Sequence, residues 1–368
     1  MKLAFGLVLA LHAGLHLIGF VKGFDLARVT QLTSPISRSM ACVWLTGAVL
    51  LLAATIALFA APRWFWVLAF AGVLTSQVAI AAAWHDARFG TALNVIVLLV
   101  GVYGAFAWGP FGLRAEYEAR TAQHLAQLAK APLVTEADLG RLPAPLQRYL
   151  RYVGVVGHPQ VRGFRVRFTG RIRSGPTAAW MAFTGEQHNF TSPATRLFWM
   201  RATLHGLPVD ALHAYDEGSA RMRVKLLSLF PVVDAGGKDF TRTETVTLFN
   251  DLCILAPATL IDPTIRWQEL DSRNVEGTFT NGAHTIRGVL QFDDAGALVN
   301  FWSDDRPSLA PDGVTFVPQR WSTPVGGYRA AGPFKLASRG EGRYAAATGE
   351  YPYIQFVGLE VSYDLTAH

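Results

Sequence analysis

Residues 3–21 read LAFGLVLALHAGLHLIGFV, an apolar run that contains no charged side chain. Its length is close to the ~20 residues that an α-helix needs to cross the hydrocarbon core of a bilayer. Three comparable runs follow at residues 40–61, 64–84 and 91–108. The sequence therefore predicts a four-helix transmembrane domain over residues 1–110, with the lipid bilayer as its first partner.

The composition agrees with a membrane protein. Of the 368 residues, 51% are hydrophobic and only 16% are charged. The net charge of +6 fits Lys and Arg side chains that flank membrane helices, so we do not expect a nucleic-acid partner. The first run lacks a small-residue cleavage site and carries His12 and His16, which favours a retained helix over a signal peptide.

Orientation in the membrane is less clearly encoded. Lys and Arg residues are equally numerous on the two sides of the predicted helices, so the positive-inside rule does not decide. The richness in Ala, Gly, Leu and Arg is typical of bacterial proteins. We therefore expect a multi-pass protein of the bacterial inner membrane, and we place its soluble domain in the periplasm because that domain has the character of an extracytoplasmic module.

Residues 111–158 form a predicted helical linker. Leu113, Tyr117 and Leu125 recur at helical spacing among charged residues, which indicates an amphipathic helix. Thr135 and Asp138 have the spacing of a capping box, and a second short helix is expected to follow it.

From residue 159 to residue 368 the apolar period changes from helical to twofold. Phe164, Val166 and Phe168 alternate with arginines, as in a strand with one buried face. One helix is expected at residues 241–256, where Thr241 and Glu244 have capping-box spacing. The predicted fold is a membrane α-helical bundle followed by an α+β domain, in which a curved antiparallel sheet forms a half-barrel with a covering helix.

Several stretches resemble an uncharacterised family of bacterial membrane proteins with a domain of unknown function. They are His12-Ala-Gly-Leu-His16-Leu-Ile-Gly-Phe20, Asp86-Ala-Arg-Phe-Gly-Thr91 with Asn94, Leu142-Pro-Ala-Pro-Leu-Gln-Arg-Tyr149, and Tyr215-Asp-Glu-Gly218 with Met222. In outline the soluble part also resembles the periplasmic lipoprotein-carrier fold. That resemblance implies a lipid-like or acyl ligand, whereas the four membrane helices argue against a shuttling role.

Two groups of residues in the soluble domain are candidates for ligand binding. The aromatic candidates for a hydrophobic pocket are Phe183, Phe198, Trp199, Trp267, Phe292, Trp302 and Trp321, although such residues often fill a core instead. The candidates for contact with anionic lipid headgroups are Arg165, Arg167, Arg171 and Arg173, although a charged outer face also protects a sheet from aggregation.

The predicted membrane helices contain a third group. His12 and His16 are four residues apart, on one face of the first helix, and His85 follows the third helix. Imidazole ligates metals and haem and titrates near neutral pH, so these residues are candidates for a metal, haem or proton-relay site. The alternative is a set of interhelical hydrogen bonds that fix the packing of the helices.

No motif identifies an enzyme or a cofactor. Asp210, His213, Asp216 and Glu217 could supply a general acid and base, but their spacing matches no hydrolase or metalloenzyme signature. The leading hypothesis is therefore non-enzymatic binding of a hydrophobic or lipid-like ligand, or of an envelope component, by the half-barrel. A half-barrel interior filled by its own side chains would contradict this hypothesis, and a membrane redox, metal or haem protein is the alternative.

Overall fold

The computed structural model describes residues 2–310, 312, 314–347, 349–363 and 365. The chain divides into two compact units, Met1–Glu116 and Tyr117–His368, called here the helical unit and the sheet unit. Helix α6 (Leu113–Leu125) includes residues of both units.

The helical unit contains four helices long and apolar enough to cross a membrane, as the sequence predicts. They are α1 (Lys2–Gly23), α2 (Arg38–Ala60), α3 (Pro62–Ala82) and α5 (Gly90–Ala107), with the short α4 (Trp84–Ala87) between the last two. Pro62 begins α3 directly after α2, so the connection is a tight hairpin.

Glycines let aromatic rings lie close to neighbouring helices in this bundle. A Cβ atom at Gly19 would lie 2.1 Å from the Trp44 ring, and one at Gly47 would lie 2.7 Å from the His16 ring. Larger residues at these positions would displace both rings. The two glycines therefore fix where Trp44 and His16 lie between α1 and α2.

The sheet unit is built on one large antiparallel sheet, which comprises fourteen strands among the described residues. One half contains β1 (Gly163–Ile172), β2 (Met181–Thr191), β3 (Ala194–Leu204), β4 (Leu207–Asp216), β5 (Ser219–Leu226) and β6 (Phe230–Gly236). The other half contains β7 (Arg266–Glu269), β8 (Asn274–Asn281), β9 (His284–Phe292), β10 (Leu298–Ser303), β13 (Trp321–Ser322), β14 (Val325–Gly326), β17 (Arg339–Ala346) and β18 (Gly349–Ser362). Two small hairpins add β11 (Ser308–Leu309) with β12 (Phe316–Val317), and β15 (Arg329–Ala331) with β16 (Phe334–Leu336).

The chain fills this sheet from its middle outward. It runs from β1 through consecutive neighbours to the edge strand β6, and then through α9 (Lys238–Leu255) and the 3₁₀ turn Pro257–Ile261 to the opposite edge strand β7. From β7 it returns to the middle, where β18 pairs with β1. The edges β6 and β7 do not pair, so the sheet is an open half-barrel and not a closed barrel.

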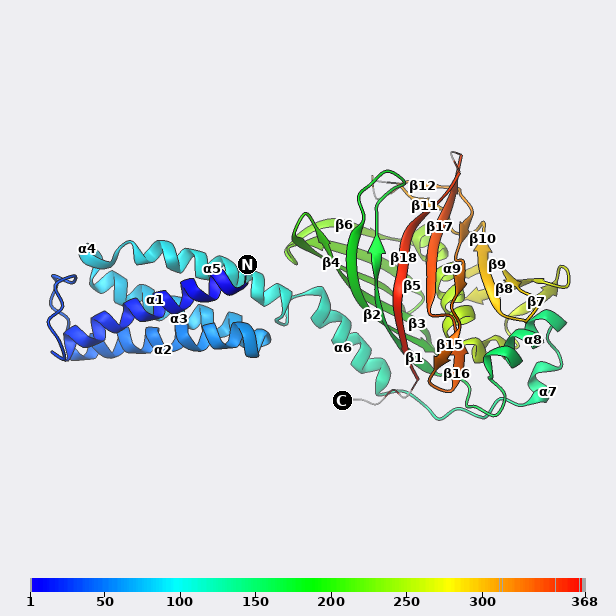
Figure 1. The fold of residues 1–368 in the computed structure, drawn as a ribbon, viewed down its shortest axis with the longest axis horizontal. Helices are drawn as coiled ribbons and strands as arrows, with labels where there is room; N and C mark the ends of the chain where they lie inside the picture. Colours follow the sequence, from blue (N-terminus) through cyan, green and yellow to red (C-terminus); the bar gives the residue numbers. More distant parts are fainter. Residues whose placement is uncertain (1, 311, 313, 348, 364, 366–368) are drawn as a thin grey trace. The chain divides into compact units, whose positions relative to one another are not determined.

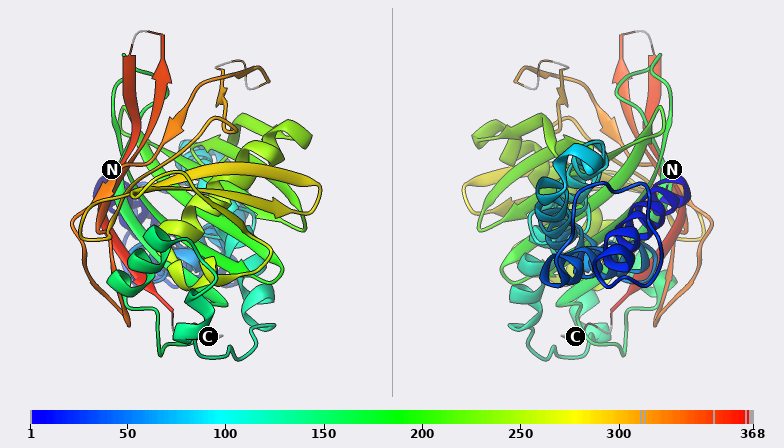
Figure 2. Two further views of the ribbon diagram at one scale, coloured as in Figure 1. Left: turned by 90° about the vertical axis from the view of Figure 1, so that its right-hand side faces the viewer. Right: turned by 90° about the vertical axis from the view of Figure 1, so that its left-hand side faces the viewer.

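Helix α9 is the covering helix that the sequence predicts, and it is buried along almost its whole length. Figure 2 shows two further views in which α9 remains against the curved sheet. The capping box expected at Thr241 and Glu244 does not form, because the helix already begins at Lys238. Thr241 Oγ1 instead donates to Gly237 O at 2.8 Å, and Glu244 faces buried partners inside the sheet unit.

The short helices of the linker lie at the edge of the sheet unit. Helix α7 (Glu136–Leu139) has the capping box predicted at Thr135 and Asp138. Helix α8 (Ala144–Val153) ends at Gly154, whose φ of +82° is accessible to glycine at little cost. Its residues Leu146, Tyr149 and Leu150 join the core of the sheet unit.

Candidate functional site

Most of the aromatic candidates meet in the core between α9 and the sheet. Phe183, Phe198, Phe292 and Trp321 belong to one buried cluster, and Trp267 packs against it. Within that cluster the Phe249 ring of α9 lies 5.1 Å from the Phe279 ring and 5.8 Å from the Phe301 ring. These side chains therefore pack against one another, and they line none of the cavities of about 420, 230 and 210 Å³ in the described part of the chain.

The two remaining aromatic candidates face the opposite side of the sheet. Trp199 follows the core residue Phe198 on β3, and Trp302 follows the core residue Phe301 on β10, so strand alternation directs both rings outward. Trp302 lies under the guanidinium of Arg320, 3.9 Å from its ring centroid. It also lines the cavity of about 230 Å³, near Asp304 and Asp305.

Arg165, Arg167 and Arg171 lie on the outer face of β1, as alternation predicts, and Arg173 follows directly after the strand, but the four arginines have different surroundings. Arg171 and Arg173 both stack on Trp180, at 4.6 and 4.5 Å from the ring centroid. Arg165 and Arg167 lie near His188, and burial together with these two cations lowers the pKa of His188 to about 4.

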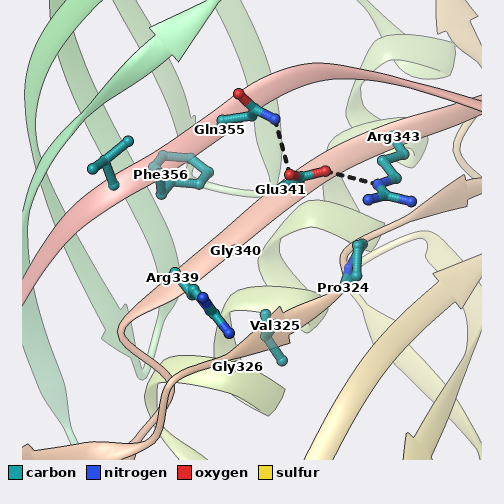
Figure 3. A pocket seen from close by; sticks show the side chains of 10 residues that line it. Pro324, Val325, Gly326, Arg339, Gly340, Glu341, Arg343, Gln355 and Phe356 are labelled. Carbon is teal, nitrogen blue, oxygen red and sulfur yellow. Dashed lines mark hydrogen bonds and ion pairs between the residues drawn. The ribbon is translucent and has the colours of Figure 1, made fainter.

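The largest of the three cavities is a groove of about 420 Å³ at β14, β17 and β18 (Figure 3). It is lined by Pro324, Val325, Gly326, Arg339, Gly340, Glu341, Arg343, Gln355, Phe356 and Val357. Val357 lies at an irregularity in the pairing of β18 with β1, and 74% of its side chain is exposed. The strand irregularity thus places an apolar side chain at the groove.

Hydrogen bonds order one wall of this groove. Glu341 accepts from Gln355 Nε2 at 2.9 Å and from Arg343 Nε at 2.8 Å, as Figure 3 shows. Gln355 in turn accepts from Arg171, which connects the arginine row to the groove. Arg343 also donates to Glu350, at 3.0 Å.

Arg339 is the exception in the groove. Its side chain is exposed and has no hydrogen bond or ion pair within the part of the chain that the structure describes. Val325 and Phe356 line the groove and also pack against the core, whereas Val357 is exposed. The groove therefore combines an exposed apolar side chain with one guanidinium whose charge no neighbouring carboxylate compensates.

The sequence contains a signal for this groove, although the groove was not among the predicted sites. Residues 339–343 read RGEGR, so Arg339, Glu341 and Arg343 alternate with glycines and must share one face of a strand. Gln355 carries no such signal, because its place beside Glu341 follows from the pairing of β17 with β18.

The four acid–base candidates do not converge. Asp210 receives two hydrogen bonds from Arg201, at 2.6 and 2.8 Å. Asp216 pairs with Arg120 and His124 of α6, at 2.8 and 3.0 Å. His213 alternates with them and faces the interior, 3.0 Å from Glu244, whereas Glu217 lies in a turn with a φ of +51°. Each carboxylate of Asp210 and Asp216 therefore has its own cationic partner.

A buried charge network fills part of the interior behind His213. Glu244 lies 3.2 Å from Arg306, and Arg196 lies 2.6 Å from Asp251. Burial by itself would raise the pKa of Glu244, but His213 and Arg306 more than offset this effect and hold that pKa below its ordinary value. The sequence gives no sign of this network, because its members come from distant strands and from α9.

In the helical unit the structure brings His12 and His16 together and separates His85 from them. The His12 and His16 rings are 4.9 Å apart and both residues are buried. The His85 side chain is 87% exposed and lies 3.3 Å from Asp86. Among the described residues, no three His, Cys, Asp or Glu side chains are grouped so that they could hold a metal ion.

His12 and His16 also line a cavity of about 210 Å³ in this unit, together with Trp44, Asp86 and Phe89. Asp86 lies outside the membrane-spanning helices and fixes the loop before α2. Its carboxylate accepts from the backbone N–H groups of Ser34 and Thr33 at 2.9 and 2.7 Å, and from Thr33 Oγ1 at 2.6 Å. These hydrogen bonds lower the pKa of Asp86. Sequence reasoning singled out the histidines but missed Trp44.

Three solved bacterial structures show a distant likeness to the chain. One is described as an outer membrane lipoprotein-sorting protein domain from Vibrio parahaemolyticus, with 10% identity, 55% of this chain and 86% of that chain covered, and a TM-score of 0.34. The second is a DUF1329 family protein from Desulfovibrio piger, with 12% identity, 61% and 94% covered, and a TM-score of 0.35. The third is a LolA superfamily protein from Nitrosomonas europaea, with 11% identity, 62% and 92% covered, and a TM-score of 0.28.

These neighbours include the lipoprotein-carrier type of domain that the sequence led us to expect. Their low TM-scores carry no argument about function. No curated protein matches the sequence. A family model does match residues 132–356, more than half of the chain, and confirms the predicted membership of a family without a known function. The chain belongs to the family of unknown function DUF6544.

Proposed function

We propose that the protein is a membrane-anchored binding protein, and that the groove on β14, β17 and β18 takes an amphipathic, anionic, lipid-like ligand. The observation that carries this proposal is the uncompensated Arg339 in one open groove with the exposed apolar side chain of Val357, beside Val325 and Phe356, which also pack against the core. An ordinary surface arginine does not require a ligand. An arginine beside a groove of about 420 Å³ offers an anionic head a charge partner and its tail an apolar surface.

The packed interior contradicts the expectation that the half-barrel holds the ligand inside, so the proposed ligand lies outside it. The aromatic side chains between α9 and the sheet are each other's partners, and a ligand there would have to displace them from a packed core. The groove needs no such rearrangement. Arg171, which reaches Gln355, extends the positive surface along the sheet from Arg339.

The membrane helices give the proposal its setting. A lipid-like ligand is at high local concentration for a protein held at a bilayer, and the proposed location is the bacterial inner membrane with the sheet unit in the periplasm. A C-terminal fusion to alkaline phosphatase, which folds only in the periplasm, tests this orientation. Fluorescence of a C-terminal green fluorescent protein fusion in the cytoplasm would contradict this orientation.

The binding proposal is tested with the full chain in nanodiscs and with 11-(dansylamino)undecanoic acid as probe, after subtraction of the signal from empty nanodiscs. Arg339→Ala removes a charge-assisted contact, so we expect about tenfold weaker binding, which corresponds to about 1.4 kcal/mol. Val357→Asp should weaken binding further, because it places a negative charge beside the anionic head.

Arg266→Ala is the matched control, since Arg266 is also exposed and lies on the distant edge strand β7. This variant should bind the probe like the unmodified protein. Equal affinity for the Arg339, Val357 and Arg266 variants would show that the groove is not the binding site.

A further inference from the structure

The cavity of the helical unit has a composition unlike the rest of the bundle. Its volume is about 210 Å³, and its wall joins His12 and His16 of α1 to Trp44 of α2. Gln31, Asp86 and apolar residues complete it, and two of the apolar residues, Leu15 and Phe89, are 42% and 79% exposed on the surface of the unit. Leu15 lies on α1, whereas Gln31, Asp86 and Phe89 lie in the segments that connect the long apolar helices, so the cavity lies at one end of the bundle, where the hydrocarbon of a bilayer would meet its polar boundary.

Hydrogen bonds fix the state of the His12 ring. Its Nε2 lies 2.8 Å from Asn94 Oδ1, and the amide nitrogen of Asn94 donates to Gln77 Oε1 at 3.0 Å. An amide oxygen only accepts hydrogen bonds, so Nε2 of His12 carries the proton. The other ring nitrogen, Nδ1, is then an acceptor with a free lone pair.

Three buried nitrogens on the wall of this cavity have no hydrogen-bond partner among the described residues. They are His12 Nδ1, His16 Nε2 and Trp44 Nε1. A buried polar group that neither the chain nor water satisfies is costly. One of the three is an acceptor and Trp44 Nε1 is a donor, so together they match a group that both donates and accepts.

The same geometry argues against a metal or a large cofactor. Only two imidazoles line the cavity, and the carboxylate of Asp86 is already occupied by Thr33 and Ser34. A volume of about 210 Å³ is below the range of about 300–1,000 Å³ that is typical of pockets for drug-sized ligands. The cavity admits a single ring and excludes a porphyrin.

We infer that this cavity binds the head group of a membrane-soluble amphiphile, a single ring that carries hydroxyl or carbonyl oxygens, as in a quinol or quinone. A hydroxyl donates to the lone pair of His12 Nδ1 and accepts from Trp44 N–H, while His16 Nε2 pairs with a second oxygen. These nitrogens lie within the wall, so binding includes a small turn of the imidazole of His16 about its Cβ–Cγ bond. The apolar tail leaves past Leu15 and Phe89 into the bilayer.

The test uses the full chain in nanodiscs and decylubiquinol as probe, with binding measured above empty nanodiscs. Trp44→Phe keeps the ring and removes the N–H donor, and we expect at least tenfold weaker binding. Ala87 lines the cavity, so Ala87→Leu reduces the volume of the cavity while all three nitrogens stay in the chain, and we expect binding to be lost. With ¹⁵N-labelled histidine, the Nδ1 resonance of His12 should move when the probe is added to the unmodified protein and stay in place in Ala87→Leu.

Trp64→Phe is the matched control, because Trp64 is 56% exposed on α3 and does not line the cavity. It should bind the probe normally, and so should Arg339→Ala, which separates this site from the groove of the sheet unit. Binding that is indifferent to both Trp44→Phe and Ala87→Leu would overturn the inference. So would a cavity that exchanges only water, with no probe bound and an unmoved His12 resonance.

Discussion

The two units bury polar groups in different ways. In the sheet unit the interior charges meet opposite charges, with Arg196 2.6 Å from Asp251 and Arg306 3.2 Å from Glu244. In the helical unit Asn94 satisfies one nitrogen of His12, but the nitrogens of the cavity wall have no partner among the described residues. Buried groups that find partners within the chain hold the chain together. The sheet unit also contains buried polar atoms without a partner among the described residues, such as Asn189 Nδ2 and Asn300 Oδ1, but these residues line none of the three cavities, whereas the three in the helical unit belong to residues that line one cavity.

The surface of the sheet unit repeats this distinction. Glu341 and Arg343 pair with each other in the groove, whereas Arg339, two residues away, has no partner within the described part of the chain. Both proposed sites therefore rest on the same physical sign, which is a polar group left unpaired where its neighbours are paired. The following variants test whether the paired groups are structural.

The largest effect is expected from Arg306→Leu. Arg306 is buried and bonds to Glu244, Thr247 and Tyr344, so its loss removes the guanidinium that pairs with the buried Glu244 carboxylate. Removal of one member of a buried ion pair costs about 3–5 kcal/mol of unfolding free energy. Chemical denaturation of the full chain in detergent, followed by circular dichroism, measures the change.

Arg320→Ala is its control, because the pair of Arg320 with Asp304 at 2.9 Å lies on the surface. Exposed pairs contribute about 0–1 kcal/mol. If the two variants lowered the free energy of unfolding equally, the buried network would contribute no more to stability than an exposed ion pair does.

A smaller effect is expected from acid, through His188. Burial, with the help of Arg165 and Arg167, lowers its pKa to about 4, while the unfolded chain has the ordinary value near 6.5. Between these values the unfolded state binds a proton that the folded state does not, so stability falls as the pH falls from 6.5 to 4. The loss attributable to His188 is about 3 kcal/mol at most.

His188→Asn should flatten the stability profile over this pH range, as measured by thermal unfolding at each pH. His205→Asn changes an exposed turn residue with a φ of +49°, which asparagine accepts, and should leave the profile as it is. If the pH profile of stability of His188→Asn ran parallel to that of the unmodified protein, His188 would not be a neutral imidazole in the folded state. The contact of Tyr117 Oη with His188 Nδ1 at 2.6 Å would then not stabilise the neutral form.

The smallest effect is expected in the bundle, from Asn94→Leu. This change breaks the bonds to His12 and Gln77, but interhelical hydrogen bonds in membranes contribute only about 1 kcal/mol. Refolding from sodium dodecyl sulfate into bicelles measures it. Thr46→Val is the control, because Thr46 Oγ1 bonds only to Cys42 O of its own helix. A loss of stability as large as that of Arg306→Leu would contradict the expectation that buried polar contacts contribute less to stability in the helical unit than in the sheet unit.

The elements of both units were predictable where the apolar period is regular. The four apolar runs identify the helices that are long and apolar enough to cross a membrane, and the alternation of Phe164, Val166 and Phe168 with arginines identifies β1 and its buried face. Helix α9 was predicted, but its start was placed three residues late, because Glu244 was given a local capping role and in fact reaches Arg306.

The candidate sites were predictable only in part. His12 and His16 were identified because a membrane helix seldom carries ionisable groups. The alternation in RGEGR shows which face of the strand carries Arg339, but Arg339 was missed. Nothing in the sequence shows that no Asp or Glu of another strand pairs with it. The position of Trp44 beside the two histidines cannot be read from the sequence either, because it depends on how closely Gly19 lets α1 approach the Trp44 ring.

The sequence by itself determined the helical and strand periods, the four helices apolar and long enough to span a membrane, and which residues share a face, because these follow from local geometry along one chain. Only the tertiary structure decided that the half-barrel interior is filled by α9, that Arg171 reaches Gln355, and that residues 12–16 and 86–90 line one cavity. The physical reason is that pairing, burial and cavities are relations between segments far apart in the chain, and no local pattern records which groups remain without a partner.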